Sequence, residues 1–308
     1  MTVIWFNHAI QDEERRRRLY AGEIFVYDDL RSVAEFASFA REIVEAALAA
    51  YDPLRVHEAL TPSELASVLG RLKPTFTHHH ESRRLASRIL DELGTDLDDC
   101  HMDVPKLRTS YPTGHLTKGI AYAFPAHRDT WYGGPQAQIN WWLPIYPLSG
   151  DNAMALYPRY FSNPVVNDSD QFNYYRRNVE RRGVAKFVDE DPRVQPSAIG
   201  LSQDEPEFRL LPAVGGLIVF SGSQLHATAS SAGCLSRYSV DFRTVSRSDV
   251  ERGLGAPNLD VRCTGTALRD FRRASDAAPM PEELARRLDP VGPTQDELAV
   301  FNPRAQDR

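Results

Sequence analysis

Residues 215–242 read GGLIVFSGSQLHATASSAGCLSRYSVDF and combine two strand patterns with a histidine between them. Gly215 and Gly216 open a β-branched run that breaks at SGS, and an extended run resumes at His226. After a loop, a further strand is predicted from Arg237 to Val245. Side chains alternate along a strand, so its polar members share one face: Arg237, Ser239, Asp241 and Arg243.

The residue composition and periodicity of the chain change near residue 104. From there to residue 246, short runs rich in β-branched and aromatic residues alternate with Gly, Pro, Asn and Ser, which predicts an antiparallel sandwich or barrel. Residues 1–103 have mainly helical periodicity. We predict helices that begin after an N-cap at Asp29, after Thr61 and near Thr77. The fold class is therefore α+β, with helices buttressing one face of the sheet.

The domain organisation expected for the 308 residues is a single unit. It consists of a helical part (1–103), a β core (104–246) and a charged, Pro-rich C-terminal extension (247–308). A polar insert at about 162–206 is long for a plain connection, which predicts a lid or a decorated loop.

Composition narrows the range of partners. The net charge of −6 argues against nucleic acid, because neutralising phosphates needs a basic face. No apolar run approaches the roughly 18 residues that a membrane span needs, and the start of the chain lacks the order of a signal peptide. Three scattered cysteines without a CxxC pair (Cys100, Cys234 and Cys263) suit a reducing compartment. We therefore expect a cytoplasmic protein with a small-molecule substrate and an undetermined oligomeric state.

The stretch HRDTWYGGP at 127–135 is the first half of a possible metal site. His127 and Asp129 follow the apolar and aromatic strand IAYAFPAH, where neighbouring strands can bring them next to His226. Two histidines and one carboxylate form a facial triad, which leaves positions open on an octahedral iron(II) ion. Arg237, with Ser239 two residues later, has the chemistry of a carboxylate clamp.

Two other histidine groups test this assignment. The triplet His101-Met102-Asp103 has the same spacing as His127-Arg128-Asp129, but we expect it in a connection before the first strand. Residues 78–80 are three consecutive histidines predicted in the first turn of a helix. Consecutive helical side chains diverge by about 100°, so they cannot converge on one ion.

The order His127-x-Asp129, His226, Arg237-x-Ser239 resembles the iron(II)/2-oxoglutarate-dependent oxygenases. The flanks resemble the phytanoyl-CoA dioxygenase-like branch over roughly residues 105–245. The segment INWWLPIYPLSGDNAMALYPRYF keeps the turn asparagine and the proline of that branch but departs from its Gly-Ser-His ending. The motif also looks like oxygenases that tailor natural products, including aminoglycoside antibiotics.

This resemblance implies a double-stranded β-helix (jelly-roll, cupin-like) core and three reactants besides the substrate: Fe(II), 2-oxoglutarate and O2. It implies His127, Asp129 and His226 as metal ligands, with Arg237 and Ser239 binding the distal carboxylate of 2-oxoglutarate. Related halogenases replace the carboxylate ligand with a small residue. Asp129 therefore points to hydroxylation, desaturation or oxidative ring closure.

Further candidates surround these residues. Gln138 and Asn140 share a strand face and could bind the keto acid end of 2-oxoglutarate. Arg243 shares a face with Arg237 but lacks a serine two residues later, so we favour Arg237 as the clamp. Candidate substrate contacts come from the residues after Asp129, the first strand and the preceding loop: Trp131, Tyr132, Arg108 and His115.

Two alternatives remain open from the sequence. A cupin-like metal-dependent hydrolase or isomerase would use the same barrel without 2-oxoglutarate, although such reactions need no clamp like Arg237 and Ser239. A non-enzymatic metal-binding or ligand-binding module would hold the ion without turning over oxygen. Release of succinate separates both alternatives from the oxygenase.

Overall fold

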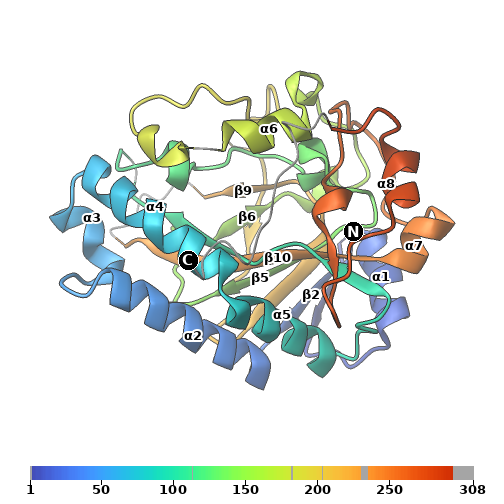
Figure 1. The fold of residues 1–308 in the computed structure, drawn as a ribbon, viewed down its shortest axis with the longest axis horizontal. Helices are drawn as coiled ribbons and strands as arrows, with labels where there is room; N and C mark the ends of the chain where they lie inside the picture. The colour runs from blue at the N-terminus through green and yellow to red at the C-terminus, as the bar shows by residue number, and fades with distance from the viewer. Residues whose placement is uncertain (1, 113, 182, 203, 230–234, 294–308) are drawn as a thin grey trace.

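A computed structural model describes residues 2–112, 114–181, 183–202, 204–229 and 235–293. Its core is a larger sheet of eight strands and a smaller sheet of three (Figure 1). In order across the larger sheet, the strands are β1 (Ile4–Phe6), β2 (Ile24–Tyr27), β8 (Leu217–Ser221), β5 (Ile139–Pro144), β10 (Arg237–Ser246), β3 (Cys100–Met102) and β11 (Arg272–Arg273), with β4 (Lys106–Ser110) also paired to β10. The smaller sheet runs β7 (Phe208–Arg209), β6 (Met154–Leu156) and β9 (His226–Thr228).

Strand β10 organises the larger sheet because it pairs antiparallel with β5, β4 and β3. Its apolar residues point to one side, where the Phe242 ring stacks on Trp141 of β5 at 5.7 Å. Its polar residues point to the other side, toward the smaller sheet. Trp142, Ile218 and Phe220 of the larger sheet pack there against Met154 and Leu156 of the smaller one.

Helices cover the apolar face of the larger sheet. α2 (Arg31–Ala47), α4 (Pro62–His78) and α5 (His80–Glu92) lie side by side along it in Figure 1. The buried face of α2 follows helical spacing through Val33, Phe36, Ala40 and Val44. These side chains join one hydrophobic core with the sheet residues Trp141 and Phe242 and with neighbouring strands. The predicted buttress of helices on one face of a sheet is confirmed.

Besides its helices, the N-terminal part contains β1, β2 and β3, which the sequence did not predict, because short strands whose partners lie far along the chain carry little local signal. The parallel pairing of β1 with β2 makes the larger sheet mixed. The described strands between residues 104 and 246 pair antiparallel with one another, as predicted. The predicted N-cap at Asp29 was wrong: Leu30 occupies the N-cap position of α2 without a side-chain cap hydrogen bond, and Asp29 precedes it in a left-handed conformation with φ of 60°.

The histidine run 78–80 was also misplaced. Helix α4 begins after the Thr61 cap, as predicted, but it continues through Pro74 to His78. His79 then ends α4 and caps α5, and His80 is the first residue of α5. The run is therefore a junction between two helices rather than the first turn of one.

The insert and the C-terminal extension complete the molecule. The insert at 162–206 contains α6 (Tyr174–Glu180) with the short turns η5 (Ser169–Gln171) and η6 (Val184–Lys186), at the top of Figure 1. The extension contains α7 (Arg247–Arg252), η7 (Ala267–Asp270) and α8 (Glu282–Leu288). Its Phe271, Met280 and Leu284 pack against Val245 of β10. The remaining short elements are α1 (Asp12–Tyr20), η1 (Pro53–Arg55), α3 (Val56–Ala59), η2 (Gly119–Ala121), η3 (Asp129–Tyr132) and η4 (Pro158–Tyr160).

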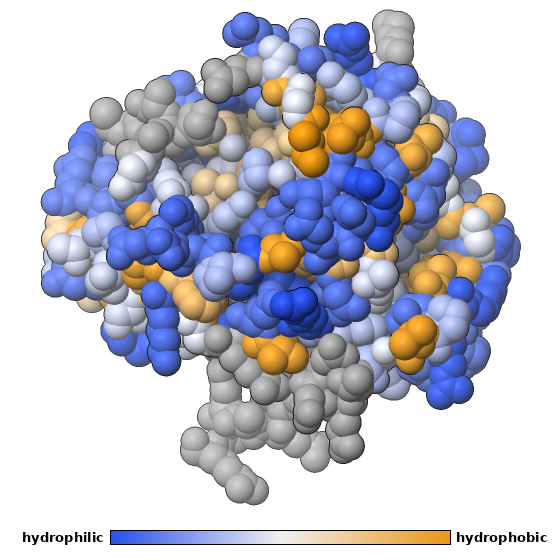
Figure 2. Space-filling model, turned by 90° about the horizontal axis from the view of Figure 1, so that it is seen from above, coloured by the Kyte–Doolittle hydropathy of each residue, from blue (hydrophilic) through white to orange (hydrophobic). Residues whose placement is uncertain are grey.

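The surface seen from above is mostly hydrophilic, with hydrophobic residues in separate small patches (Figure 2). Among the described residues, no helix is long and apolar enough to cross a membrane. Cys100 and Cys263 are free thiols, and Cys234 lies outside the described residues.

Candidate metal centre

Three side chains predicted as metal ligands converge between the two sheets. His127 and His226 form an antiparallel bridge in which each backbone N–H donates to the other residue's carbonyl at 2.9 Å. Asp129 begins η3, where its N–H donates to Gly222 O at 2.9 Å. Asp129 Oδ1 then lies 3.6 Å from His127 Nε2 and 3.8 Å from His226 Nε2. All three residues are buried, and their potential ligand atoms lie within 4.8 Å of one another.

The backbone orients both imidazoles toward the centre. His127 Nδ1 lies 2.8 Å from Pro125 O, and His226 Nδ1 lies 3.0 Å from Gln224 O. A carbonyl can only accept, so each Nδ1 carries the proton and each Nε2 presents a lone pair. Burial and the neighbouring His127 lower the pKa of His226 to about 4. At neutral pH, His226 is therefore a neutral imidazole, the form that binds metals.

Asp129 is held by two donors on one of its oxygens. Arg243 Nε donates to Oδ2 at 3.0 Å, and Gln138 Nε2 donates to the same oxygen at 3.1 Å. Burial alone would raise the pKa of Asp129, but Arg243 and the two imidazoles lower it well below its usual value. Oδ1 remains directed at the histidines as an ionised ligand atom.

This donor set fits a divalent transition metal. Two neutral imidazole nitrogens and one carboxylate oxygen suit iron(II), and three ligands on one side leave positions open for other molecules. The carbonyls and Arg243 that orient the ligands are the kind of support that such sites need.

Arg237 and Ser239 lie on the same polar face, at the start of β10. Arg237 Nη1 donates to Asn152 O at 3.1 Å, and its guanidinium carbon lies 5.8 Å from the centre of the Trp142 ring. Arg237 Nε and Ser239 Oγ are both buried, and neither has a hydrogen-bond partner among the described residues. Burial and nearby Arg108 lower the pKa of Arg237 to about 10, so it stays charged.

These two orphaned groups fit a carboxylate. A buried donor without a partner costs about 1–3 kcal/mol, so a pair of them signals a ligand that supplies acceptor atoms. Apolar rings lie near both sites: Trp142, beside Arg237, packs with Phe220, and the Phe220 ring lies 5.3 Å from that of His226. A small dicarboxylate could place one end on Arg237 and Ser239 and the other beside the histidines.

Gln138 and Asn140 lie next to the metal centre, on the side of Asp129. The Gln138 amide donates to both Asp129 Oδ2 and Asn140 Oδ1, the latter at 2.9 Å. The structure therefore shows Gln138 orienting a metal ligand. Contact of either residue with 2-oxoglutarate stays a prediction.

Arg108 and Arg243 are both satisfied by carboxylates. Arg108 donates to both oxygens of Asp241, at 2.6 and 3.2 Å, and it lies opposite Ser239 in the sheet. Arg243 contacts Asp129, Asp241 and Asp103. Only Arg237 among these three has an orphaned guanidinium nitrogen, which is the reason to keep it as the carboxylate clamp.

The four residues predicted as substrate contacts separate into different environments. Tyr132 lies beside the metal centre, with its ring 5.2 Å from that of His127 and its hydroxyl donating to Pro196 O at 3.0 Å. Trp131 is fully buried, and its indole N–H donates to Asp260 at 2.7 Å. His115 lies by the N-terminal helices, 5.9 Å from the His57 ring. Tyr132, beside the metal centre, and Arg108, on the polar face of the larger sheet, are therefore better placed to contact a substrate than Trp131 and His115.

Sequence reasoning missed the partners that come from distant segments. Asp103 accepts from the backbone N–H of Arg243 at 2.8 Å, and Asp260 of the extension accepts from Arg128 at 3.1 Å. Neither aspartate has a local signal, because each partner lies more than 130 residues away in the chain. Only the strand pairing of β3 with β10 could have suggested the first of these contacts.

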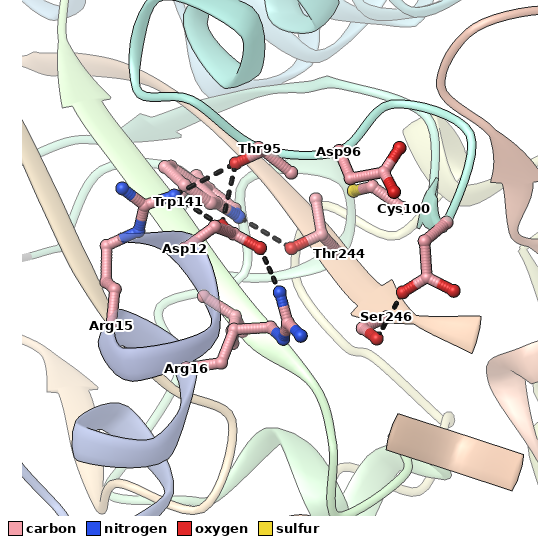
Figure 3. Close-up of a pocket in the computed structure, with 11 residues that line it drawn as sticks. Asp12, Arg15, Arg16, Thr95, Asp96, Cys100, Trp141, Thr244 and Ser246 are labelled. Carbon is pink, nitrogen blue, oxygen red and sulfur yellow. Dashed lines mark hydrogen bonds and ion pairs between the residues drawn. The ribbon is translucent and has the colours of Figure 1, made fainter. Parts of the chain in front are cut away.

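A separate small cavity lies between α1 and the larger sheet (Figure 3). Its charged groups already pair with one another: Asp12 binds Arg15, Arg16 and Thr95, and Ser246 binds Asp99. Trp141 likewise donates to Thr244 at 2.8 Å. These contacts join α1 to the sheet and leave the metal centre on the opposite face as the candidate functional site.

Comparison with known proteins finds no matching family model and no matching curated protein. Solved structures show weak similarity. The epimerase SnoN in complex with Fe3+, alpha ketoglutarate and nogalamycin RO is 13% identical over 77% of this chain and 85% of its own, with a TM-score of 0.39. The non-heme monooxygenase ThoJ is 12% identical over 70% of each chain, with a TM-score of 0.37.

EvdO2 from Micromonospora carbonacea var. aurantiaca, complexed with 2-oxoglutarate, is 14% identical with a TM-score of 0.35. The match covers 53% of this chain and 59% of EvdO2, so this chain spans less than two thirds of that structure.

Proposed function

We propose that the protein is a non-haem iron(II)/2-oxoglutarate-dependent dioxygenase that oxidises a small polar molecule. The observation that carries this proposal is the pair of buried, unpartnered groups on Arg237 and Ser239. They share the polar face of β10 with Arg243, which holds the Asp129 ligand. A metal centre alone would not require an orphaned carboxylate clamp.

Each residue has a definite part in this proposal. His127, His226 and Asp129 Oδ1 hold iron(II), and Arg243 and Gln138 keep Asp129 Oδ2 occupied. Arg237 and Ser239 bind the distal carboxylate of 2-oxoglutarate. When bound, the iron supplies the activation of dioxygen that is coupled to decarboxylation of 2-oxoglutarate to succinate. Trp142 and Phe220 keep water away from the space between the two ends.

The proposal extends to the fold and the reaction type. We propose that the two facing sheets are a double-stranded β-helix, with β9 carrying His226 and the start of β10 carrying Arg237. Because the carboxylate ligand Asp129 is present, the reaction proposed is hydroxylation, desaturation, oxidative ring closure or a related C–H oxidation in natural-product biosynthesis. A hydrolase or isomerase on the same scaffold would leave Arg237 and Ser239 without a purpose.

Anaerobic spectroscopy tests the proposal directly. Purified protein mixed with iron(II) and 2-oxoglutarate should develop the weak visible charge-transfer band of the chelate. Asp129→Ala with His226→Ala should abolish the band, and Arg237→Gln should raise the 2-oxoglutarate concentration needed to reach half of it. Absence of the band in the wild type, or an undiminished band in the double variant, would refute the assignment.

A further inference from the structure

The insert carries a second buried arginine with guanidinium nitrogens that have no hydrogen-bond partner among the described residues. Arg177 of α6 is 7% exposed, and its Nε and Nη1 have no hydrogen-bond partner among the described residues. Burying a guanidinium without an acceptor is costly, because the donors lose water and gain nothing in return. The unpartnered nitrogens of Arg177 make it a candidate for binding a ligand that supplies acceptor atoms.

Arg193 of the same insert is a buried arginine whose guanidinium has hydrogen-bond partners, and it serves as a comparison for Arg177. It is buried to a similar degree, at 8% exposed. Its guanidinium donates to both oxygens of Asp191, and it also donates to Gly119 O at 2.9 Å. Asp191, a carboxylate whose charge acts on Arg177, is thus already paired with Arg193.

Arg177 faces the metal centre side of the insert. Tyr174 lies three residues earlier on the same face of α6. Tyr174 packs against Gly133, where an added Cβ would lie 3.0 Å from the Tyr174 Cβ, so this face rests on the residue that follows Tyr132. Tyr132 in turn lies 5.2 Å from the His127 ring. Burial raises the pKa of Tyr132 well above its usual value, and the charge of Arg177 opposes that shift.

Other polar groups of the insert are also unsatisfied. Both the oxygen and the nitrogen of the Gln195 amide are buried without a partner among the described residues. Gln195 precedes Pro196, whose carbonyl accepts from the Tyr132 hydroxyl at 3.0 Å. The amide and Arg177 are thus both attached to elements that contact Tyr132.

The acidic residues of the insert do not offer a matching site for an amine. Asp168 accepts from the backbone N–H of Ser197 at 2.7 Å, and Asp191 is paired with Arg193. Asp170 is exposed and lies 3.5 Å from Arg262. Each of these three carboxylates thus has a partner, whereas Nε and Nη1 of Arg177 have none among the described residues.

We propose that Arg177, assisted by Gln195, binds an acidic group of the substrate, with the oxygen atoms of a carboxylate, phosphate or sulfate as acceptors. The inference rests on the proposed function in one respect: the ligand is the molecule oxidised at His127, Asp129 and His226. It narrows the substrate class to an anionic small molecule, in contrast to the aminoglycosides that the resemblance to natural-product tailoring oxygenases suggested.

Anion binding without iron tests this inference. Acetate, inorganic phosphate and sulfate are titrated into the metal-free full chain at constant ionic strength, with binding followed by calorimetry. Wild type should bind at least one of them, and Arg177→Gln should weaken that binding by roughly tenfold or more. The ranking of the three anions identifies which acidic group is preferred. Arg176→Gln, on the exposed side of the same helix, should leave the binding unchanged.

The clamp variant separates the two anion sites. Arg237→Gln should weaken 2-oxoglutarate binding, whereas Arg177→Gln should leave it within about twofold of the wild type. If Arg177→Gln weakens 2-oxoglutarate as much as Arg237→Gln does, Arg177 belongs to the co-substrate site and the inference is wrong. The titration with acetate, phosphate and sulfate needs no iron, whereas the chelate band that tests the proposed function does. Anion binding can therefore fail while the band is present, which would refute only the role of Arg177, or succeed while the band is absent, which would refute only the proposed function.

Thermal stability provides a second, independent readout. Removing an unpaired buried charge should leave the melting temperature of Arg177→Met unchanged or raise it. Arg193→Met should lower it, because Asp191 would lose its partner. Equal destabilisation by both substitutions would show that Arg177 is structural and would overturn the assignment.

Discussion

The two His-x-Asp triplets of this chain share sequence spacing and part of their geometry but differ in what surrounds them. His101 Nδ1 lies 3.1 Å from the carbonyl of Asp99, two residues earlier, just as His127 Nδ1 lies 2.8 Å from that of Pro125. Both histidines are buried. Their partners differ: His127 and Asp129 meet His226, whereas Asp103 meets the cations Lys106 and Arg243. The His-x-Asp motif alone is therefore insufficient to define a metal site, and His226 as a third ligand distinguishes the second triplet from the first.

Arg243 connects the two triplets. Its guanidinium contacts Asp103 at 3.4 Å and Asp129 at 3.0 Å, so the first triplet supports the ligand of the second. The sequence placed residues 101–103 in a connection, and this was wrong: residues 100–102 form β3 and pair with β10 next to Arg243. The first triplet thus contributes an aspartate that helps to position Arg243 rather than a metal ligand.

The largest expected difference between the triplets is in metal binding. Asp129→Ala should reduce iron(II) affinity by more than the roughly 10–100-fold typical of changes to residues that only orient a ligand. His101→Ala should leave the affinity within about twofold of the wild type, since this imidazole lies outside the group formed by His127, Asp129 and His226. Equilibrium titration of iron(II) under anaerobic conditions measures both values, and equal losses would remove the distinction.

Removing Arg243, which connects the two triplets, should have the next largest effect on metal binding. Arg243→Met leaves Asp129, Asp103 and Asp241 without their shared cation, and loss of one partner of a buried ion pair costs about 3–5 kcal/mol. We expect the metal-free protein to lose stability by that order in chemical denaturation and iron(II) affinity to fall about 10–100-fold. The half-exposed Arg247, which begins α7, provides the control Arg247→Met, for which neither quantity should change appreciably.

A smaller effect is expected from the aspartate of the first triplet. Asp103→Asn keeps the shape and the acceptor oxygen for the Arg243 N–H but removes one of the three negative charges around this arginine. Iron(II) affinity should fall by less than in Arg243→Met, by a factor of about 10 or below. An affinity loss equal to that of Asp129→Asn would show that Asp103 acts on the metal directly.

The smallest effect concerns protonation of His101. Burial lowers its pKa below the ordinary value of about 6.5, so the unfolded chain binds more protons than the folded one in that window. The stabilising contribution of the neutral imidazole is present above about pH 6.5 and is lost as the pH falls toward the folded-state pKa. His101→Gln should therefore flatten the dependence of the unfolding free energy of the metal-free protein on pH below about pH 6.5. An unchanged slope of the unfolding free energy against pH would show that His101 does not contribute to the pH dependence of stability.

Much of the site could be anticipated because strand alternation is a local rule. It placed Arg237 and Ser239 on one face with Arg243, and the same rule puts Trp141 and Trp142 in different hydrophobic clusters on opposite sides of the sheet. Strand alternation could not show that Arg243 is surrounded by carboxylates while Arg237 is not. This difference depends on the positions of Asp103, Asp129 and Asp241, which come from three different strands or turns.

The sequence alone determined the helical face of α2, the alternating faces of β10, and the chemical suitability of His127, Asp129 and His226 for a metal. These properties depend on residue type and on separations of a few positions, which local backbone geometry converts into shared faces. Only the tertiary structure decided that β3 borders β10 and that Arg243 joins the two triplets. It also decided that Arg193 pairs with Asp191, whereas Nε and Nη1 of Arg177 have no hydrogen-bond partner among the described residues. Those facts depend on contacts between distant segments, because the charge state and the role of a buried group are set by the partners that folding brings to it.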